Sequence, residues 1–67
     1  MAVASVSKIT AASSESFDAA VREGVERASK TLRGITGVHV VEQKASVAGN
    51  KISEYRVTME VTFILEN

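Results

Sequence analysis

The sequence predicts an α+β domain whose elements follow the order strand, helix, strand, strand. Three observations carry this prediction. Apolar residues alternate along residues 52–65, apolar residues recur at helical spacing between Ser14 and Gly34, and Gly49 and Asn50 form a turn signal between two strand-like stretches. The second and third strands then form an antiparallel hairpin. Because one helix covers only one face of a sheet, the other face meets solvent, a ligand or another subunit.

Residues 1–12 predict the first strand, in which serines and a threonine interrupt the apolar residues. This composition favours an edge strand or a subunit contact. We expect Ser13 or Ser14 to cap the following helix through its hydroxyl, and Gly34 to end the helix in the left-handed conformation.

The predicted helix has one apolar and one charged face. The apolar stripe, which Ala20 and Gly24 widen, consists of Phe17, Val21, Val25, Ala28 and Leu32. Gly24 lowers helix propensity by up to about 1 kcal/mol relative to Ala, and we interpret it as allowing close packing against a sheet. Three acid–base pairs at i, i+4 spacing indicate a solvated opposite face: Asp18–Arg22, Glu23–Arg27 and Glu26–Lys30.

Residues 37–48 predict the second strand and residues 52–65 the third. In the third strand every odd-numbered residue from Tyr55 to Leu65 is apolar, which places one face on a core. The alternating stretch spans roughly 35 Å at about 3.3 Å per residue. Since a strand of this length outruns the predicted helix, we expect a partner chain to cover the remainder.

The composition limits the possible classes of function. The chain has 67 residues, with eight basic and eight acidic side chains and a formal net charge of zero. This length predicts one domain over residues 1–67. The balanced charge gives no electrostatic reason to expect nucleic acid or a membrane as a partner. There is no apolar run of the roughly 18 residues needed for a membrane span and no pattern of a secretory signal, so we expect a cytoplasmic protein.

The short length also predicts self-association. A chain of about 60 residues buries only about 60% of its unfolded surface, and its own core seldom supplies more than about 3–5 kcal/mol. There is no cysteine, which excludes disulfides and thiolate metal sites. A homo-oligomer is therefore expected, and a monomer with a well-packed core is the alternative.

The sequence contains little that suggests catalysis. His39 is the only histidine, and without a cysteine or an evident acid partner it is interpreted as an ordinary strand residue rather than a general base or metal ligand. No phosphate-binding loop, HExxH motif or EF-hand spacing is present. Ser13 and Ser14 are interpreted as helix caps rather than nucleophiles. We therefore predict a protein that is not an enzyme and has no catalytic residues.

Charged residues on the predicted strands leave two kinds of binding site open. Symmetry could gather carboxylates at an axis to hold Ca²⁺, although no local motif assigns metal ligands; the candidates are Glu42, Glu54, Glu60 and Glu66. Arg56 interrupts the third strand on the face away from the core. We expect it to pair with a strand carboxylate, and the alternative is contact with an anionic ligand.

Four segments form a pattern: Ser13 before a short helix, KTLRGI at residues 30–35, VVEQ at residues 40–43 and EYRVTMEVTFILE at residues 54–66. This pattern resembles the dodecin family over nearly the whole chain, most specifically in the last segment. The resemblance implies a three-stranded antiparallel sheet partly wrapped around the helix and assembly into a hollow homododecamer. It also implies a non-catalytic protein that binds, stores or buffers a flavin, either FMN or riboflavin.

Three positions of the flavin site implied by this resemblance are altered. Gly37 stands where flavin-binding members carry a Trp that stacks on the ring, Arg56 where they carry a Gln on its other side, and Lys44 where they carry an Arg. Without the Trp, the stacking energy of about 0.5–1.5 kcal/mol beyond buried area is lost. An anionic ligand, calcium as in a branch of the family that also lacks the Trp, and an assembly without ligand are therefore alternatives to flavin.

Overall fold

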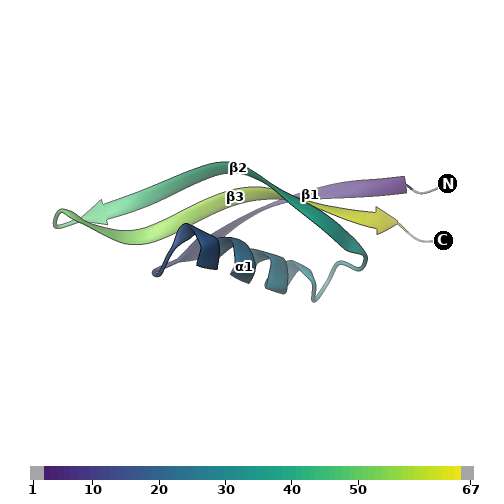
Figure 1. Cartoon of the computed structure of the whole chain (residues 1–67), viewed down its shortest axis with the longest axis horizontal. Coiled ribbons are helices and arrows are strands. Elements are labelled where there is room, and N and C mark those ends of the chain that lie inside the picture. Colours follow the sequence, from purple (N-terminus) through teal and green to yellow (C-terminus); the bar gives the residue numbers. More distant parts are fainter. Residues whose placement is uncertain (1–2, 66–67) are drawn as a thin grey trace.

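The computed structural model describes residues 3–65 as one sheet and one helix (Figure 1). The elements are β1 (Val3–Ser13), α1 (Phe17–Ala28), β2 (Ile35–Ala48) and β3 (Lys51–Leu65). The strands are antiparallel in the order β1-β3-β2, so the last strand in the chain is central. The predicted order of elements is confirmed. The first two residues of the predicted first strand lie outside the described residues, as does Glu66.

The core lies between α1 and the odd-numbered residues of β3. Val57, Met59 and Val61 are fully buried there, as the period of two predicted. A Cβ added to Gly24 of α1 would lie 2.8 Å from Met59 Cε and 3.2 Å from Ala11 Cβ. The absence of a side chain at this position therefore allows the helix to approach the sheet closely, as expected from the sequence.

Both predicted ends of the helix were wrong. Ser16, and neither Ser13 nor Ser14, is the N-cap, and its Oγ accepts a hydrogen bond from the Ala19 backbone N–H at 3.0 Å. Ser13 Oγ accepts from the Glu15 backbone N–H at 2.9 Å and so shapes the preceding turn. Three nearby serines offered equivalent caps, and the choice depends on where β1 ends.

The C-terminal end of the helix also differs from the prediction. α1 ends at Ala28, whose carbonyl accepts from Leu32 N–H at 2.8 Å beyond the helix. Gly34 does adopt a left-handed φ of 71°, but it uses this conformation to enter β2 and does not end the helix.

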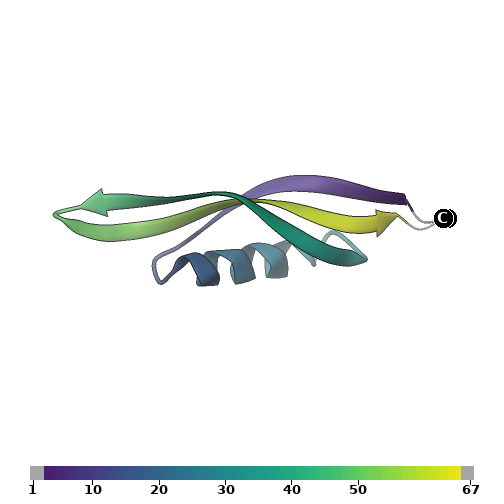
Figure 2. The ribbon, with the colours of Figure 1, turned by 45° about the horizontal axis from the view of Figure 1, so that its top comes forward.

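The hairpin between β2 and β3 turns at Gly49 and Asn50, as predicted. Both residues have positive φ, 58° and 65°, which is typical of a two-residue type I′ turn. β1 pairs with β3 only as far as Ser13 opposite Tyr55, so the hairpin beyond this row has two strands. This end projects past the start of α1 (Figure 2).

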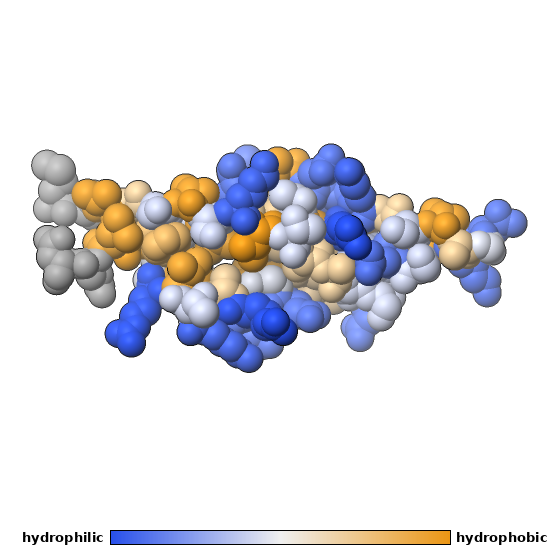
Figure 3. Space-filling view, turned by 180° about the vertical axis from the view of Figure 1, so that it is seen from behind, coloured by the Kyte–Doolittle hydropathy of each residue, from blue (hydrophilic) through white to orange (hydrophobic). Residues whose placement is uncertain are grey.

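The single chain is more extended than a compact protein of its size. Its dimensions are 52 × 19 × 13 Å, and its radius of gyration is 13.8 Å, against about 11 Å for a compact chain of this length. Its accessible surface is 4965 Å², against roughly 4,100 Å² for a monomer of this mass. Exposed apolar residues gather toward both ends (Figure 3): Val3, Val6 and Leu65 at one, Val47 and Ile52 at the other.

No helix within residues 3–65 is long and apolar enough to cross a membrane.

Candidate functional site

The face of the sheet opposite α1 carries the predicted site residues, and we call it the open face. Even-numbered residues of β3 from Arg56 to Thr62 point to this face, because the odd-numbered residues point to α1. The register places residues of the other strands beside them: Val6, Lys8, Thr10 and Ala12 of β1, and Gly37, His39, Glu42 and Lys44 of β2. A hydrogen bond of 3.1 Å between the Thr10 and Thr58 hydroxyls confirms that these side chains share one face.

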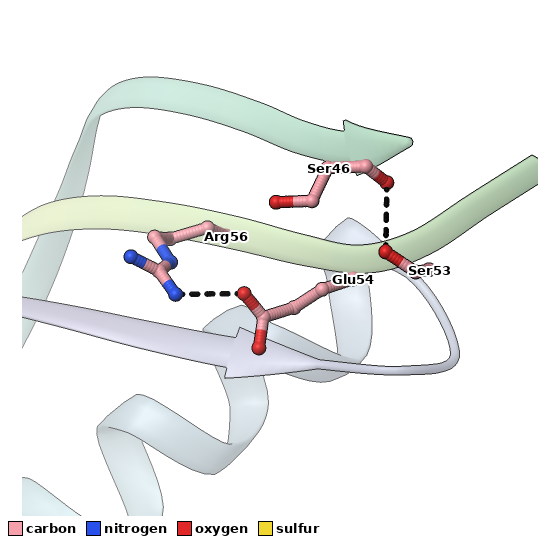
Figure 4. Close-up of polar contacts among 4 residues, drawn as sticks. All are labelled: Ser46, Ser53, Glu54 and Arg56. Carbon is pink, nitrogen blue, oxygen red and sulfur yellow. Dashed lines mark hydrogen bonds and ion pairs between the residues drawn. The ribbon is translucent and has the colours of Figure 1, made fainter. Parts of the chain in front are cut away.

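Lys44 and Arg56 lie directly opposite each other on neighbouring strands. Arg56 Nη2 donates to Glu54 Oε1 at 2.7 Å, which confirms the expected pairing with a strand carboxylate (Figure 4). Lys44 Nζ lies 3.8 Å from Glu42 Oε1. Both pairs are largely exposed, and exposed ion pairs contribute only about 0–1 kcal/mol, so these cations can exchange carboxylate contacts for an anion from solution.

The strand geometry beside Arg56 is irregular. The register of β2 and β3 shifts between Ser46 and Val47, where Ser53 Oγ donates to the Ser46 carbonyl at 3.2 Å (Figure 4). A bulge of this kind bends the strand and redirects nearby side chains. The Glu54–Arg56 pair therefore lies where the three-stranded sheet meets the projecting two-stranded end of the hairpin.

His39 has a partner that the sequence analysis missed. Its Nδ1 lies 3.3 Å from Glu60 Oε1, and Lys8 lies opposite Glu60 on the other side. Counting outward from the Gly49–Asn50 turn, where Ala48 pairs with Lys51, also brings His39 opposite Glu60, but only because the register shifts at Ser46/Val47 and Val40/Glu42 cancel. The His39 side chain remains 75% exposed, which agrees with an ordinary strand histidine on an accessible face.

Gly37 pairs with Thr62 and leaves open space on the sheet. A Cβ added there would meet no atom within 4 Å, so the position could hold a much larger side chain. Gly37 and Arg56 do not come together within one chain. Positions 62 and 56 of β3 are separated by roughly 20 Å at about 3.3 Å per residue. The structure thus brings Lys44 and Arg56 together and leaves Gly37 remote from both.

The carboxylates predicted as metal ligands do not form a cluster within one chain. Among residues 3–65, no three His, Asp or Glu side chains lie close enough together to hold a metal ion. Glu42, Glu54 and Glu60 each contact a basic side chain instead. Glu66 lies outside the described residues.

Comparison with known proteins identifies the family. The family model Dodecin matches residues 3–66. The chain belongs to the dodecin family. A curated dodecin from Thermus thermophilus is 34% identical over 59 residues, which cover 88% of this chain and 86% of the relative.

Solved dodecin structures agree with this fold along almost the whole chain. Dodecin from Streptomyces davaonensis matches with a TM-score of 0.94 and 35% identity over 98% of this chain and 97% of that one. A calcium dodecin from Mycobacterium tuberculosis, described as calcium-chelating with a novel calcium-binding site, matches with a TM-score of 0.82 and 34% identity over 96% and 91% of the two chains. The three-stranded sheet and single helix are therefore the dodecin fold.

Proposed function

We propose that this dodecin is a non-catalytic homododecamer that binds and buffers a flavin carrying a phosphate, such as FMN. The observation that carries the proposal is the Lys44–Arg56 row on the open face. The balanced charge gives no reason to add nucleic acid or membranes as partners, and a chain without cysteine suits the reducing cytoplasm.

The two side chains suit different parts of such a ligand. A guanidinium group is planar, so Arg56 can stack on an aromatic ring or hold a phosphate through two parallel hydrogen bonds. Lys44, opposite it, adds a second positive charge to the same row. Arg56 would therefore supply part of the ring contact that a Trp at position 37 would otherwise provide, and it also favours an anionic ligand.

The site would be completed by a second subunit. Because Gly37 and Arg56 are roughly 20 Å apart along one sheet, a ligand that touches both positions must lie between two chains. The extended shape of the chain and its excess accessible surface support self-association. Assembly and ligand binding are thus parts of the same proposal.

The test compares FMN with riboflavin, which lacks the phosphate. We expect flavin fluorescence to be quenched on binding and FMN to bind at least tenfold more tightly, because a hydrogen bond to a charged group contributes about 1.5–3 kcal/mol. Arg56→Gln should remove most of this preference, and it should weaken riboflavin binding much less than FMN binding because riboflavin loses only the ring contact. Arg22→Gln, which alters an exposed arginine of α1 paired with Asp18, is the matched control. Equal affinities for the two flavins would contradict the role of the phosphate.

Calcium binding is the second candidate, favoured by the similarity to a calcium dodecin over 96% of this chain. Carboxylates of several subunits would have to supply the ligands, and each would leave its present basic partner. Adding EDTA to purified protein should then lower both its assembly mass and its melting temperature. If EDTA changes neither quantity and no flavin is quenched, the protein is a structural assembly without ligand.

A further inference from the structure

We propose that His39 and Glu60 hold a divalent transition-metal ion of the zinc class on the open face. The two residues lie directly opposite each other on β2 and β3. His39 Nδ1 and Glu60 Oε1 are 3.3 Å apart. This pair occupies a different row of the sheet from Lys44 and Arg56, so the proposal goes beyond flavin binding.

The separation of the two atoms fits a shared metal ion better than a strong hydrogen bond. Charge-assisted N–H···O bonds are usually about 2.7–2.9 Å long, so a separation of 3.3 Å leaves the pair loosely joined. Tetrahedral Zn²⁺ lies about 2.0–2.1 Å from an imidazole nitrogen and about 2.0–2.2 Å from a carboxylate oxygen, which sets these two donor atoms about 3.4 Å apart. The ion can therefore enter with little movement of either side chain.

The two donor groups favour one class of metal. A neutral imidazole can keep its hydrogen on Nε2 and offer the Nδ1 lone pair, while the carboxylate offers a charged oxygen. Imidazole suits zinc, copper and nickel, whereas Ca²⁺ takes six to eight oxygen ligands. The chain has no cysteine, so thiolate ligands do not contribute. The expected ion therefore differs from the calcium considered above.

The surroundings keep the site open to solution. The side chains of His39 and Glu60 are 75% and 41% exposed. Among the described residues 3–65, no third His, Asp or Glu side chain is close enough to complete the site, so water would fill the remaining positions. Two protein ligands are fewer than the three or four of resident zinc sites, so we expect reversible binding.

Lys8 of β1 opposes metal binding. It lies opposite Glu60 on the other side of β3, and its positive charge repels a cation held there. Lys8 is exposed, so solvent and salt screen this charge and its long side chain can turn away. Removing the charge should therefore strengthen the site, which gives a test of opposite sign to the removal of a ligand.

The first experiment is calorimetric titration of Zn²⁺ into untagged protein dialysed free of metal and flavin. We expect one ion per chain. His39→Ala and Glu60→Gln should each lower the affinity at least tenfold, since even the outer partners of metal ligands typically contribute about 10- to 100-fold. Glu26→Gln, which alters an exposed carboxylate of α1, is the matched control and should bind as the unaltered protein does.

Circular dichroism should show the same fold in all these variants. Failure of the unaltered protein to bind Zn²⁺ would overturn the proposal. So would undiminished binding by His39→Ala, or an equal loss of affinity in Glu60→Gln and Glu26→Gln.

A second titration tests the position and the chemistry of the site. Lys8→Gln should raise the affinity for Zn²⁺ severalfold, and an unchanged affinity would contradict an ion beside Glu60. A large excess of Ca²⁺ should not displace Zn²⁺, and displacement would contradict an imidazole ligand. Because no flavin is present, protein that binds Zn²⁺ but not FMN refutes only the proposed function. Protein that binds FMN but not Zn²⁺ refutes only this inference.

Discussion

The two faces of β3 differ although their residues alternate along one strand. Toward α1, Val57, Met59 and Val61 are fully buried. Toward the open face, Arg56 forms an ion pair with Glu54, and Glu60 Oε1 lies 3.3 Å from His39 Nδ1, all with exposed or half-exposed side chains. Burial of apolar area stabilises the fold, whereas exposed ion pairs contribute little to it. The helix-facing side therefore maintains the fold, whereas the open face stays accessible to other molecules. Substitutions one residue apart on β3 should accordingly affect either stability or ligand affinity.

The largest expected effect is on the helix-facing side. Met59→Ala should lower the free energy of unfolding by about 2–5 kcal/mol, because it removes a fully buried side chain and leaves a cavity. Thr58→Ala, the adjacent position on the open face, should cost less than about 1.5 kcal/mol, since it breaks only the exposed hydrogen bond to Thr10. Chemical denaturation followed by circular dichroism measures both. Equal losses would contradict the division between the two faces.

A smaller effect, on flavin affinity, is expected at Gly37, where the open face lacks a side chain. Gly37→Trp should increase affinity for both FMN and riboflavin by roughly threefold to tenfold, which corresponds to a stacking contribution of about 0.5–1.5 kcal/mol. Stability should change little, because a Cβ at this position meets no atom within 4 Å. Gly37→Ala is the control and should bind as the unaltered protein does. If both variants bind flavin equally, position 37 does not contact the ligand.

The smallest expected change concerns the ion pair beside the proposed phosphate contact. Glu54→Gln should change the free energy of unfolding by less than about 1 kcal/mol, because the Glu54–Arg56 pair is exposed. It should nevertheless raise FMN affinity severalfold, since Arg56 loses its competing carboxylate. Thermal unfolding and fluorescence titration provide the two measurements. A loss of FMN affinity would show that Glu54 positions Arg56 for the ligand instead of competing with it.

The sequence predicted the fold well where a short-range pattern determines it. The alternation from Tyr55 to Leu65 specified the helix-facing side of β3, which is buried at Val57, Met59 and Val61 but exposed at Leu65. The Gly49–Asn50 dipeptide specified the hairpin. The choice of Ser16 as the helix cap depends on where β1 ends, and local preferences among the three serines do not determine this.

The candidate site was less predictable because it depends on register. The sequence identified Arg56, Lys44 and Gly37 individually, and the strand pairing showed which of them are neighbours. Counting from the hairpin turn gives the His39–Glu60 contact only because two register shifts cancel, and the same count would place Lys44 opposite Tyr55 instead of Arg56. Contacts between subunits have no comparable signal, because no local pattern in one chain sets which residue of a second chain it meets.

Native mass spectrometry of the purified protein, with and without added FMN, tests the central claim most directly. The claim is that the open face forms a flavin site that only assembly completes. We expect a twelve-subunit mass that increases by multiples of the mass of FMN when FMN is added, and dissociated monomers without bound FMN. A monomer as the main species, a twelve-subunit mass without increments, or FMN bound to single chains would contradict the claim.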